Sequence, residues 1–238
     1  MFLMVINLRG KVTLYRLDCF LQKAKSRLTF VKKALRMWLI IPIFAYKIMI
    51  AAMINKIISE FYPLPDRSLQ SLVSMMDEVR YPKGYNLIRA GKVDTNVYFL
   101  LEGLVRSYTI INGEEVTFYF GSEGNIIYSI ESYLNGMEAN DTVELLEDSS
   151  FLTISMEALH RLYVSDIHIA NWGRKMAEDG MLRTKKEFIY ILSLDATQRY
   201  QMLVCKRPDL LQRVPLGLIA SYCGVTQATL SRIRAKIK

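Results

Sequence analysis

The feature that most restricts the fold of this chain is the spacing of glycines in its middle part. Seven of the twelve glycines fall between Gly84 and Gly136, and the runs between them are short and rich in β-branched and aromatic residues. Such residues favour strands, and glycine favours turns. Short strands at regular spacing with glycine turns are typical of a small antiparallel barrel or roll. The runs are YNLIRA, NVYFLLEG, LVRSYTII, EEVTFYF, DTVELLED and SFLTIS.

One pair of residues in this segment is the strongest hairpin signal of the chain. Asn112-Gly113 lies between LVRSYTII and EEVTFYF, and both residue types accept the positive φ angles of a two-residue hairpin turn. Ahead of the strands, residues 55–79 have apolar residues at helical spacing. The apolar face of this predicted helix holds Leu69, Leu72, Val73 and Met76.

Helical patterns return after the last predicted strand. Ser155 is placed to cap a short helix that runs to about Tyr163, and a longer helix follows over residues 166–193. Gly173 and Gly180 lie inside this longer helix, and each lowers its stability by up to ~1 kcal/mol relative to alanine. Its apolar members are Ile169, Trp172, Met176, Phe188, Ile191 and Leu192.

A long helix with an apolar stripe between two domains is usually a packing element. We expect this one to pack against its copy in a second chain, with Trp172 and Met176 in the seam. After it, Asp195 and Gln198 form a capping-box pattern, which predicts the start of the next helix. Residues 194–238 are therefore expected to form a C-terminal domain.

The last 26 residues, RVPLGLIASYCGVTQATLSRIRAKIK, have the spacing of two short helices that cross at a steep angle. Ala220 is small enough for the crossing point, and Gly224 accepts the positive φ that the turn between the helices needs. Thr226 is placed to accept a backbone N–H as the N-cap of the second helix. The seam between the helices is expected to hold Ile219, Val225, Leu230 and Ile233.

The outward face of the second helix carries small or hydrogen-bonding side chains, which suit base edges and phosphates in a major groove. The alternative is an ordinary pair of packed surface helices. The candidate DNA-binding residues are Thr226, Gln227, Ala228, Thr229, Ser231, Arg232, Arg234 and Lys236.

The charge of the chain changes sign along its length. Residues 1–52 hold ten basic residues and one acidic residue, residues 53–193 hold thirteen basic and twenty acidic, and residues 194–238 hold eight basic and two acidic. From Arg213 onward there are five basic residues and no acidic one. A basic tip on an acidic body is typical of a nucleic-acid-binding module, because phosphate neutralisation supplies most of the non-specific affinity.

Residues 1–52 form a basic and apolar extension with three interpretations. Met37–Ile54 is apolar except for Lys47, which makes it just long enough for a transmembrane anchor with a basic flank. A signal peptide fits less well, because the basic region is too long and no small-residue cleavage site is clear. We favour the third interpretation, in which translation begins at Met49 or Met53, because the later sequence has a complete domain order.

Several classes of site have little support in the sequence. The three cysteines form no CxxC pair, which argues against disulfide, zinc and iron–sulfur sites, and Cys205 and Cys223 are expected to be buried. No P-loop, GxGxxG, HExxH or GxSxG motif occurs, so we expect no enzyme activity. His160 and His168 are better explained as ordinary helix residues than as haem ligands, and no metal site is expected.

From about Met53 to its end, the chain resembles the Crp/Fnr family of bacterial transcription regulators. The resemblance is strongest in the C-terminal segment with LLQRVP and TLSRIR, and LIRAGKVDTNVYFLLEGLVRSY and YFGSEGNII are similar to the family's cyclic-nucleotide-binding roll. It implies an α+β fold with an antiparallel β-roll over 53–165, a linking dimerisation helix over 166–193 and a winged-helix or helix-turn-helix DNA-binding domain over 194–238.

The resemblance also implies a cytoplasmic homodimer that binds a twofold site in double-stranded DNA, with RNA polymerase as a further partner. Arg232 is expected to contact a guanine, whereas Ala228 stands where the family often has Glu and can pack only on a thymine methyl. Arg234 and Lys236 are expected at the DNA backbone or in solvent. Aligned on TLSRIR, the family's base-contacting positions fall on Gln227, Ala228, Ser231 and Arg232.

The segment GSEGNIIYSIESYLNGMEANDTVE departs from family members that bind cyclic AMP. Those members carry a Gly-Glu pair and, after a short helix, an Arg beside Ser or Thr that holds the phosphate. Here Asn125 stands at the Glu position, and Ala139, Asn140 and Asp141 occupy the Arg region. Residues 107–160 contain ten acidic residues and no Lys or Arg, and a buried phosphodiester without a cation is strongly disfavoured. We therefore expect no cyclic AMP binding.

The effector and any cofactor stay open at this stage. The segment GSEGNIIYSIESYLNGMEANDTVE stands in the place of the family's phosphate-binding cassette, and we call it the cassette. Arg89, Lys92 and Arg106 are the cations that could reach a ligand there, but we expect them on the surface of the strands rather than inside the roll. A second function is a ligand-binding module tethered to a membrane by residues 37–54, whose tail mediates protein contacts alone. Binding to duplex DNA that weakens steeply with added salt would separate the two.

Overall fold

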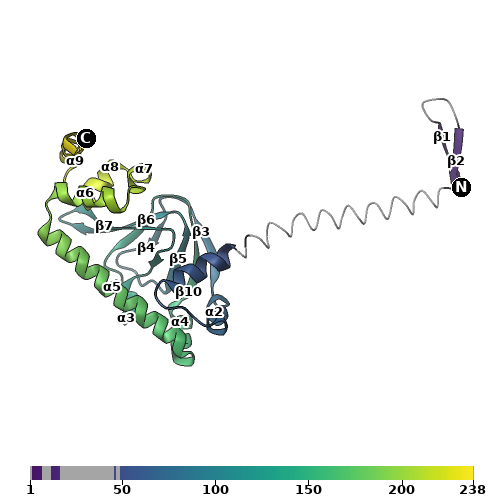
Figure 1. Ribbon diagram of the computed structural model, residues 1–238, viewed down its shortest axis with the longest axis horizontal. Coiled ribbons are helices and arrows are strands. Elements are labelled where there is room, and N and C mark those ends of the chain that lie inside the picture. The colour runs from purple at the N-terminus through teal and green to yellow at the C-terminus, as the bar shows by residue number, and fades with distance from the viewer. Residues whose placement is uncertain (1, 7–11, 17–45, 47–48, 238) are drawn as a thin grey trace. The chain divides into compact units, whose positions relative to one another are not determined.

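The computed structural model of the chain consists of two compact units, and each is described by itself. One unit covers Met1–Ala51 and the other covers Ala52–Lys238. The residues that the structure describes are 2–6, 12–16, 46 and 49–237 (Figure 1).

The first unit contains a short hairpin, in which β1 (Phe2–Ile6) pairs antiparallel with β2 (Val12–Arg16). Most of the apolar run at 37–54 lies outside the described residues. The three interpretations of the extension therefore concern residues that lie outside the described part of the chain. Within the described part of the chain, no helix combines the length and the apolar character needed to cross a membrane.

The second unit is built on a roll of two four-stranded antiparallel sheets, which confirms the expected β-roll. The strand order is β3-β10-β5-β8 in one sheet and β4-β9-β6-β7 in the other, and each of the six predicted runs contributes a strand. The strands are β3 (Asp77–Tyr81), β4 (Asn86–Ile88), β5 (Asn96–Glu102), β6 (Leu104–Ile111), β7 (Glu114–Ser122), β8 (Ile126–Ile127), β9 (Thr142–Leu145) and β10 (Ser149–Ser155).

Strands β6 and β7 form the predicted hairpin. Asn112 and Gly113 both have positive φ, 54° and 82°, so the two-residue turn is confirmed. Between Ser107 and Tyr108 the register of the pair shifts, which marks a β-bulge. The core of the roll lies between the two sheets, and in it Leu100 and Phe151 are fully buried partners on β5 and β10.

The structure corrects the single helix expected over residues 55–79. The helix in front of the roll ends at residue 59, and α2 (Asp66–Val73) is a separate helix. Pro63 and Pro65 lie between them, and proline cannot continue a helix because it lacks the backbone N–H. The end of the segment is strand β3, because it pairs with β10 in a sheet that local spacing does not reveal.

Three helices surround the end of the roll: α3 (Ile130–Asn135), α4 (Met156–Ser165) and α5 (Ile167–Ser193). Ser155 caps α4 as predicted, since its hydroxyl oxygen accepts a hydrogen bond from the N–H of Ala158 at 3.2 Å. Helix α5 runs along the roll from α4 to the C-terminal helices (Figure 1).

The first half of α5 packs against the roll of its own chain. Ile169, Trp172 and Met176 are all buried in a single chain, and the Trp172 ring stacks on Phe99 with 6.1 Å between centroids. The expectation that Trp172 and Met176 lie in a seam between two chains is therefore wrong. An apolar stripe predicts burial but does not distinguish a roll from a second copy.

Gly173 on α5 allows α4 and α5 to lie close together. A Cβ atom at this position would lie 2.5 Å from the hydroxyl oxygen of Tyr163, which is too short for two non-bonded atoms. The Tyr163 hydroxyl in turn hydrogen-bonds that of Tyr133 on α3 at 2.9 Å. The glycine that weakens the helical pattern therefore permits this close approach of the Tyr163 side chain.

The C-terminal segment consists of helices, and its buried cluster includes Leu104, Phe120 and Leu146 of the roll. The predicted capping box is confirmed, because Asp195 and Gln198 each accept a backbone N–H from the other. Residues 194–237 contain no strand. A winged helix needs a β-hairpin, so the prediction of a winged helix is wrong for this segment. The helices are α6 (Ala196–Lys206), α7 (Leu210–Arg213), α8 (Leu216–Tyr222) and α9 (Gln227–Ile237).

Candidate nucleic-acid interface

Helices α8 and α9 are joined by a tight turn with the predicted chemistry. Gly224 has φ 71°, a conformation that costs glycine little and other residues much more. The N–H of Gly224 donates to the carbonyl of Ser221 at 2.9 Å, and that of Val225 donates to the carbonyl of Ala220 at 3.0 Å. Ala220 is 1% exposed, so its small side chain sits at the contact between the two helices.

Thr226 caps α9 as the sequence predicts. Its hydroxyl oxygen accepts the N–H of Thr229 at 3.3 Å, and the two threonine hydroxyls lie 3.0 Å apart. This uses one of the N–H groups that the first turn of a helix leaves unpaired. Ile219, Leu230 and Ile233 are buried between the helices, and Val225 is partly buried at the turn. The turn and the seam thus fix the direction of α9.

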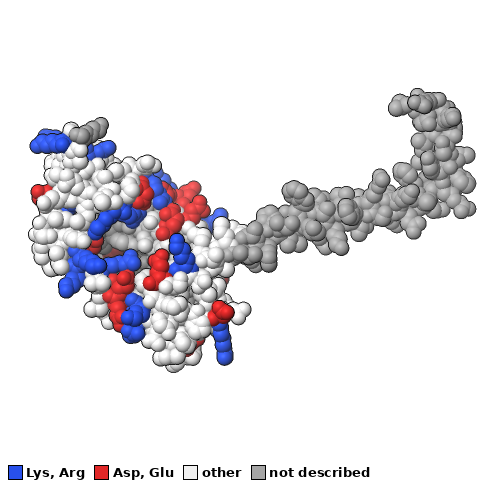
Figure 2. Space-filling model, viewed as in Figure 1, with Lys and Arg blue, Asp and Glu red and all other residues white. Residues whose placement is uncertain are grey.

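The remaining predicted residues of α9 are exposed, with the exception of Thr229, which is partly buried and bonded to Thr226. Arg234 lies on the side of α9 that borders a groove with Tyr200 and Cys205 of α6. Among the described residues, no carboxylate pairs with Arg232, Arg234 or Lys236. Figure 2 shows basic side chains at the tip that α9 forms. The exposed members of the predicted set are Thr226, Gln227, Ala228, Ser231, Arg232, Arg234 and Lys236.

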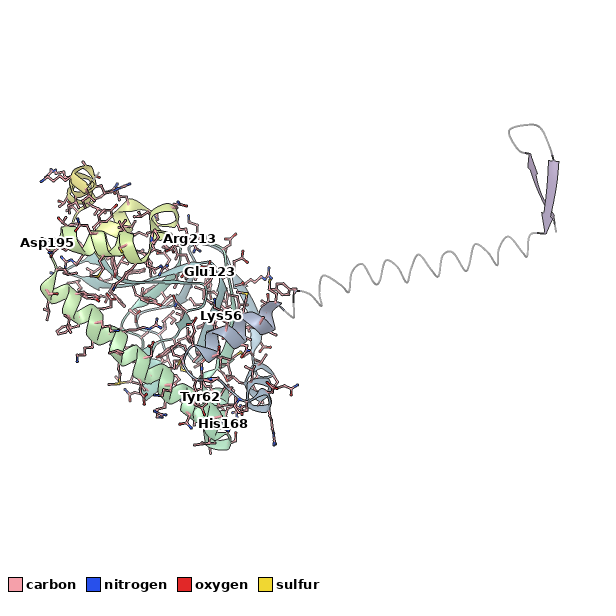
Figure 3. All side chains as sticks on the ribbon, viewed as in Figure 1. Lys56, Tyr62, Glu123, His168, Asp195 and Arg213 are labelled. Carbon is pink, nitrogen blue, oxygen red and sulfur yellow. The ribbon has the colours of Figure 1, made fainter. Side chains whose placement is uncertain are left out.

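One basic residue of the tail has a different role. Arg213, at the end of α7, forms hydrogen bonds with both oxygens of Glu123 and both oxygens of Glu147, at 2.6 to 3.0 Å. Figure 3 shows Arg213 beside Glu123 at the junction of the roll and the C-terminal helices. These hydrogen bonds from the two carboxylates raise the pKa of Arg213. The positive charge of Arg213 is therefore used inside the molecule and does not add to the outer face of α9.

Two further side chains join the C-terminal helices to the roll. Arg207, which pairs locally with Asp209, donates to the carbonyl of Phe120. The hydroxyl of Ser221 on α8 bonds the backbone of β7 at two points. Sequence reasoning missed these anchors, since each partner lies far away along the chain or in a strand edge without a motif.

The segment in the place of the family's phosphate cassette is closed by its own hydrogen bonds. The side-chain oxygen of Asn125 accepts the N–H of Ser122 at 2.9 Å. Ala139 is 2% exposed; its N–H donates to the carbonyl of Lys92, and its carbonyl accepts the N–H of Gly91, both at 2.9 Å. Neither side chain is available to hold a ribose or a phosphate.

Acidic groups dominate the same segment. The amide nitrogen of Asn140 donates to Glu131 at 3.0 Å. Burial, with a smaller contribution from the charge of Glu131, raises the pKa of Asp141. A phosphate brought here would meet two carboxyl groups, which is the reverse of what a buried anion requires.

The structure also corrects the expectation for Arg106. Its side chain is buried rather than exposed, and it donates to Glu144 at 2.6 Å and to Glu115 at 2.5 Å. Its guanidinium carbon lies 4.2 Å from the centre of the Tyr108 ring. Two carboxylates therefore neutralise this cation. Arg89 and Lys92 are exposed, as expected.

The two histidines and the two cysteines that the structure describes have ordinary surroundings. The Nδ1 of His168 lies 3.3 Å from the hydroxyl of Tyr62 (Figure 3), and His160 packs beside Tyr133. Cys223 is buried as expected, but Cys205 is exposed, in an open groove that Arg234 of α9 also lines. The described residues contain no group of three or more potential metal ligands.

The roll is similar to a known domain family. Residues 78–166 match the family model of the cyclic nucleotide-binding domain. This domain spans the roll and α4, and it includes the segment with the closed cassette. The search of curated protein sequences returned no match.

Solved structures with a similar fold include bacterial regulators. One is the c-di-GMP responsive global regulator CLP of Xanthomonas campestris, with 16% identity over 73% of this chain and 91% of that chain and a TM-score of 0.58. FixK2 of Bradyrhizobium japonicum has 20% identity over 68% and 84% and a TM-score of 0.56. A CooA mutant of Carboxydothermus hydrogenoformans has 17% identity over 70% and 78% and a TM-score of 0.53. The resemblance to Crp/Fnr regulators is thus confirmed at the level of the fold.

The residues that match the cyclic nucleotide-binding domain offer few groups for an anionic phosphate. A phosphodiester inside the roll requires an inward cation. Arg106 is paired with two glutamates, and Asp141 and Glu131 lie in the cassette. The roll has the fold of the matched domain, whereas its residues do not fit the phosphate of a cyclic nucleotide.

Proposed function

We propose that the chain is a DNA-binding transcription regulator of the Crp/Fnr type. The observation that carries this proposal is the exposed surface of α9, where Arg232, Arg234 and Lys236 have no carboxylate partner among the described residues. Small and hydrogen-bonding side chains lie between these cations. An exposed helix of this composition suits the major groove, where guanidinium groups contact guanine and phosphates accept from Arg and Lys.

The proposed regulator is a homodimer that uses the second half of α5 as its seam. Met181, Phe188 and Leu192 are 75%, 61% and 71% exposed in the single chain. Their spacing of seven and four residues places them on one face of the helix, as in the core of a coiled coil. A second copy of α5 would cover this apolar stripe. It would also place two copies of α9 for the two halves of a palindromic site.

The effector of this regulator is proposed to be a molecule other than cyclic AMP. The closed cassette and the paired Arg106 support this, because neither leaves a cation for the phosphate. A role with RNA polymerase and a place in the bacterial cytoplasm follow from the resemblance to Crp/Fnr regulators.

Binding to duplex DNA at increasing salt tests the proposal. Fluorescence anisotropy with a mixed-sequence duplex is expected to show an association constant that falls linearly with salt on logarithmic axes, with a slope of about −0.9 per neutralised phosphate. A variant with alanine at Arg232, Arg234 and Lys236 should bind weakly and with a shallower slope. A matched variant with alanine at Lys83, Lys92 and Arg161, which are exposed cations outside the C-terminal helices, should bind like the parent.

The same measurement addresses the second candidate, a membrane-tethered ligand-binding module. That function predicts no salt-dependent binding to DNA and no difference between the two triple variants. The observation in its favour is the apolar composition of residues 37–54, most of which lie outside the described residues. If neither variant differed from the parent, the DNA-binding proposal would fail.

A further inference from the structure

A cavity of about 250 Å³ lies where strand β7, the end of α5 and helices α6 and α8 meet. It is separate from the interior of the roll and from the outer face of α9. Much of its wall is apolar, and this apolar part comes from both the roll and the helices. The apolar side chains include Val116, Phe118, Ile191, Leu194, Met202 and Leu203.

Arg199 of α6 lines this cavity with an unsatisfied donor. Its Nε atom is buried and has no hydrogen-bond partner in the described part of the protein. Leaving a buried donor of a charged group unpaired costs free energy, and native structures nearly always supply a partner. The Arg199 guanidinium is therefore a hydrogen-bond donor without a partner in a largely apolar wall.

The charges around Arg199 leave the cavity positive. Lys206 lines it with its ammonium 4.3 Å from the centre of the Tyr190 ring, and the described residues offer it no carboxylate. Arg207 is paired with Asp209. Among the lining residues, all of which the structure describes, Glu187 is the one acidic residue. Figure 2 shows Lys and Arg side chains on this side of the molecule, with acidic side chains beside them.

We propose that this cavity binds a compact amphipathic carboxylic acid, with the carboxylate on Arg199 and Lys206 and the apolar body against β7 and the end of α5. A guanidinium Nε and its neighbouring amine form a fork that matches the two oxygens of a carboxylate. The apolar wall favours an aliphatic or aromatic body over a polar one. Pockets for drug-sized ligands measure about 300–1,000 Å³, so the smaller volume here selects a small acid.

The position of the cavity links two parts of the molecule. Thr117 and Phe118 belong to β7 of the roll, whereas Tyr222 and Gly224 lie at the end of α8 and in the turn before α9. A carboxylic acid bound in the cavity would contact both β7 of the roll and the end of α8. The binding site itself stands on the cavity and its charges, independently of whether α9 binds DNA.

Isothermal titration calorimetry of the full-length chain with octanoate tests the proposal, with octan-1-ol as the neutral analogue. Octanoate is expected to bind saturably with one molecule per chain, and octanol at least tenfold more weakly. Arg199→Met and Lys206→Met remove the charge but keep apolar bulk, and each should weaken octanoate binding by tenfold or more. Arg161→Met, on the exposed surface of α4, is the matched control and should bind octanoate like the parent.

Two results would overturn the proposal: no saturable octanoate binding at millimolar concentration, or equal binding by the parent and the folded Arg199→Met and Lys206→Met variants. Circular dichroism establishes whether each variant folds. If Arg199→Met unfolds, Val116→Trp provides the second test, because it fills the cavity from the β7 side and leaves Arg199 in place. Octanoate binding that survives this filled cavity would also contradict the site.

Discussion

The hydroxyl of Ser221 accepts a hydrogen bond from the backbone N–H of Thr117 at 2.9 Å and donates one to the carbonyl of Glu115 at 3.0 Å. Strand β7 is an edge strand of its sheet, and edge strands expose backbone groups that have no partner in the sheet. One side chain of α8 thus satisfies a donor and an acceptor on the edge of the roll. Through it, the helix that precedes α9 is fixed to the roll.

Ser221→Ala is expected to destabilise the chain by ~1–3 kcal/mol, because it leaves the N–H of Thr117, a residue that is 2% exposed, without its partner. Urea unfolding followed by circular dichroism measures this change. Ser231→Ala, on the exposed face of α9, is the control and should leave the free energy of unfolding nearly unchanged. Equal stabilities for both variants would show that the bond to β7 contributes nothing.

The contact between Arg213 and Glu123 is expected to depend on pH. Burial acts to raise the pKa of Glu123, but hydrogen bonds from Arg213 and from the N–H of Gly103 outweigh it and hold this pKa below its usual value. A carboxylate with a lowered pKa in the folded state stabilises the protein above its unfolded pKa. That stabilisation is lost as the pH falls through the folded pKa.

The contribution of Glu123 to the free energy of unfolding should therefore be constant near neutral pH. It should decline from about pH 4.5 downward. Glu123→Gln removes the titrating group, so the variant should be less stable than the parent at pH 7 and lose less stability between pH 5 and pH 3. Urea unfolding across this pH range, with Glu157→Gln on the exposed surface of α4 as control, measures the difference. Parallel pH curves for parent and Glu123→Gln would argue against the contribution of Glu123.

Arg232→Ala is expected to cost ~1–3 kcal/mol of DNA-binding free energy per half-site and to remove the preference for one guanine in each half. Lys236→Ala should weaken binding to all sequences by a similar factor, because a contact to phosphate carries no base information. Selection of binding sites from random duplexes, carried out with both variants and the parent, tests the two roles. An unchanged consensus for Arg232→Ala would assign base recognition to another residue.

Phe188→Asp should produce monomers, because it places a charge in the exposed apolar stripe proposed as the dimer seam. Sedimentation velocity at micromolar concentration measures the state of association. Lys186→Asp adds the same side chain to an exposed position of α5 away from the stripe and should leave the dimer intact. Trp172→Asp is expected to unfold the roll instead, since Trp172 is fully buried against Phe99. A Phe188→Asp dimer would place the interface elsewhere.

Cyclic AMP is expected not to bind at micromolar concentration, because Arg106 is neutralised by Glu144 and Glu115 and residues 107–160 contain no Lys or Arg. Calorimetry with cyclic AMP on the full chain is the direct measurement. A variant with Glu115→Gln and Glu144→Gln frees Arg106 and serves as a comparison. Micromolar affinity in the parent would show that an exposed cation such as Arg89 reaches the ligand.

The local chemistry of the chain was predictable because it depends on residues close in sequence. Thr226 bonds a residue three positions away, and the turn at Gly224 needs only a positive φ. The β-roll followed from glycine spacing in the same way. Such features require no knowledge of which elements meet.

Contacts between distant segments were not predictable from the same reasoning. Arg106 is buried because Glu144, on a neighbouring strand 38 residues away, supplies a carboxylate. Ser221 meets Thr117 across 104 residues. For Trp172, apolar spacing predicted burial correctly but could not show whether the roll or a second chain would cover it.

Gly173 determines which mutations the helix α5 tolerates. Alanine is ordinarily the mildest replacement for a helical glycine and even strengthens the helix by ~1 kcal/mol, yet here its methyl group would push against the Tyr163 ring. A shift of that ring would disturb its hydrogen bond to Tyr133. A substitution that improves the helix on its own would therefore loosen α4 and α3, and random mutagenesis selected for folding should return glycine at this position.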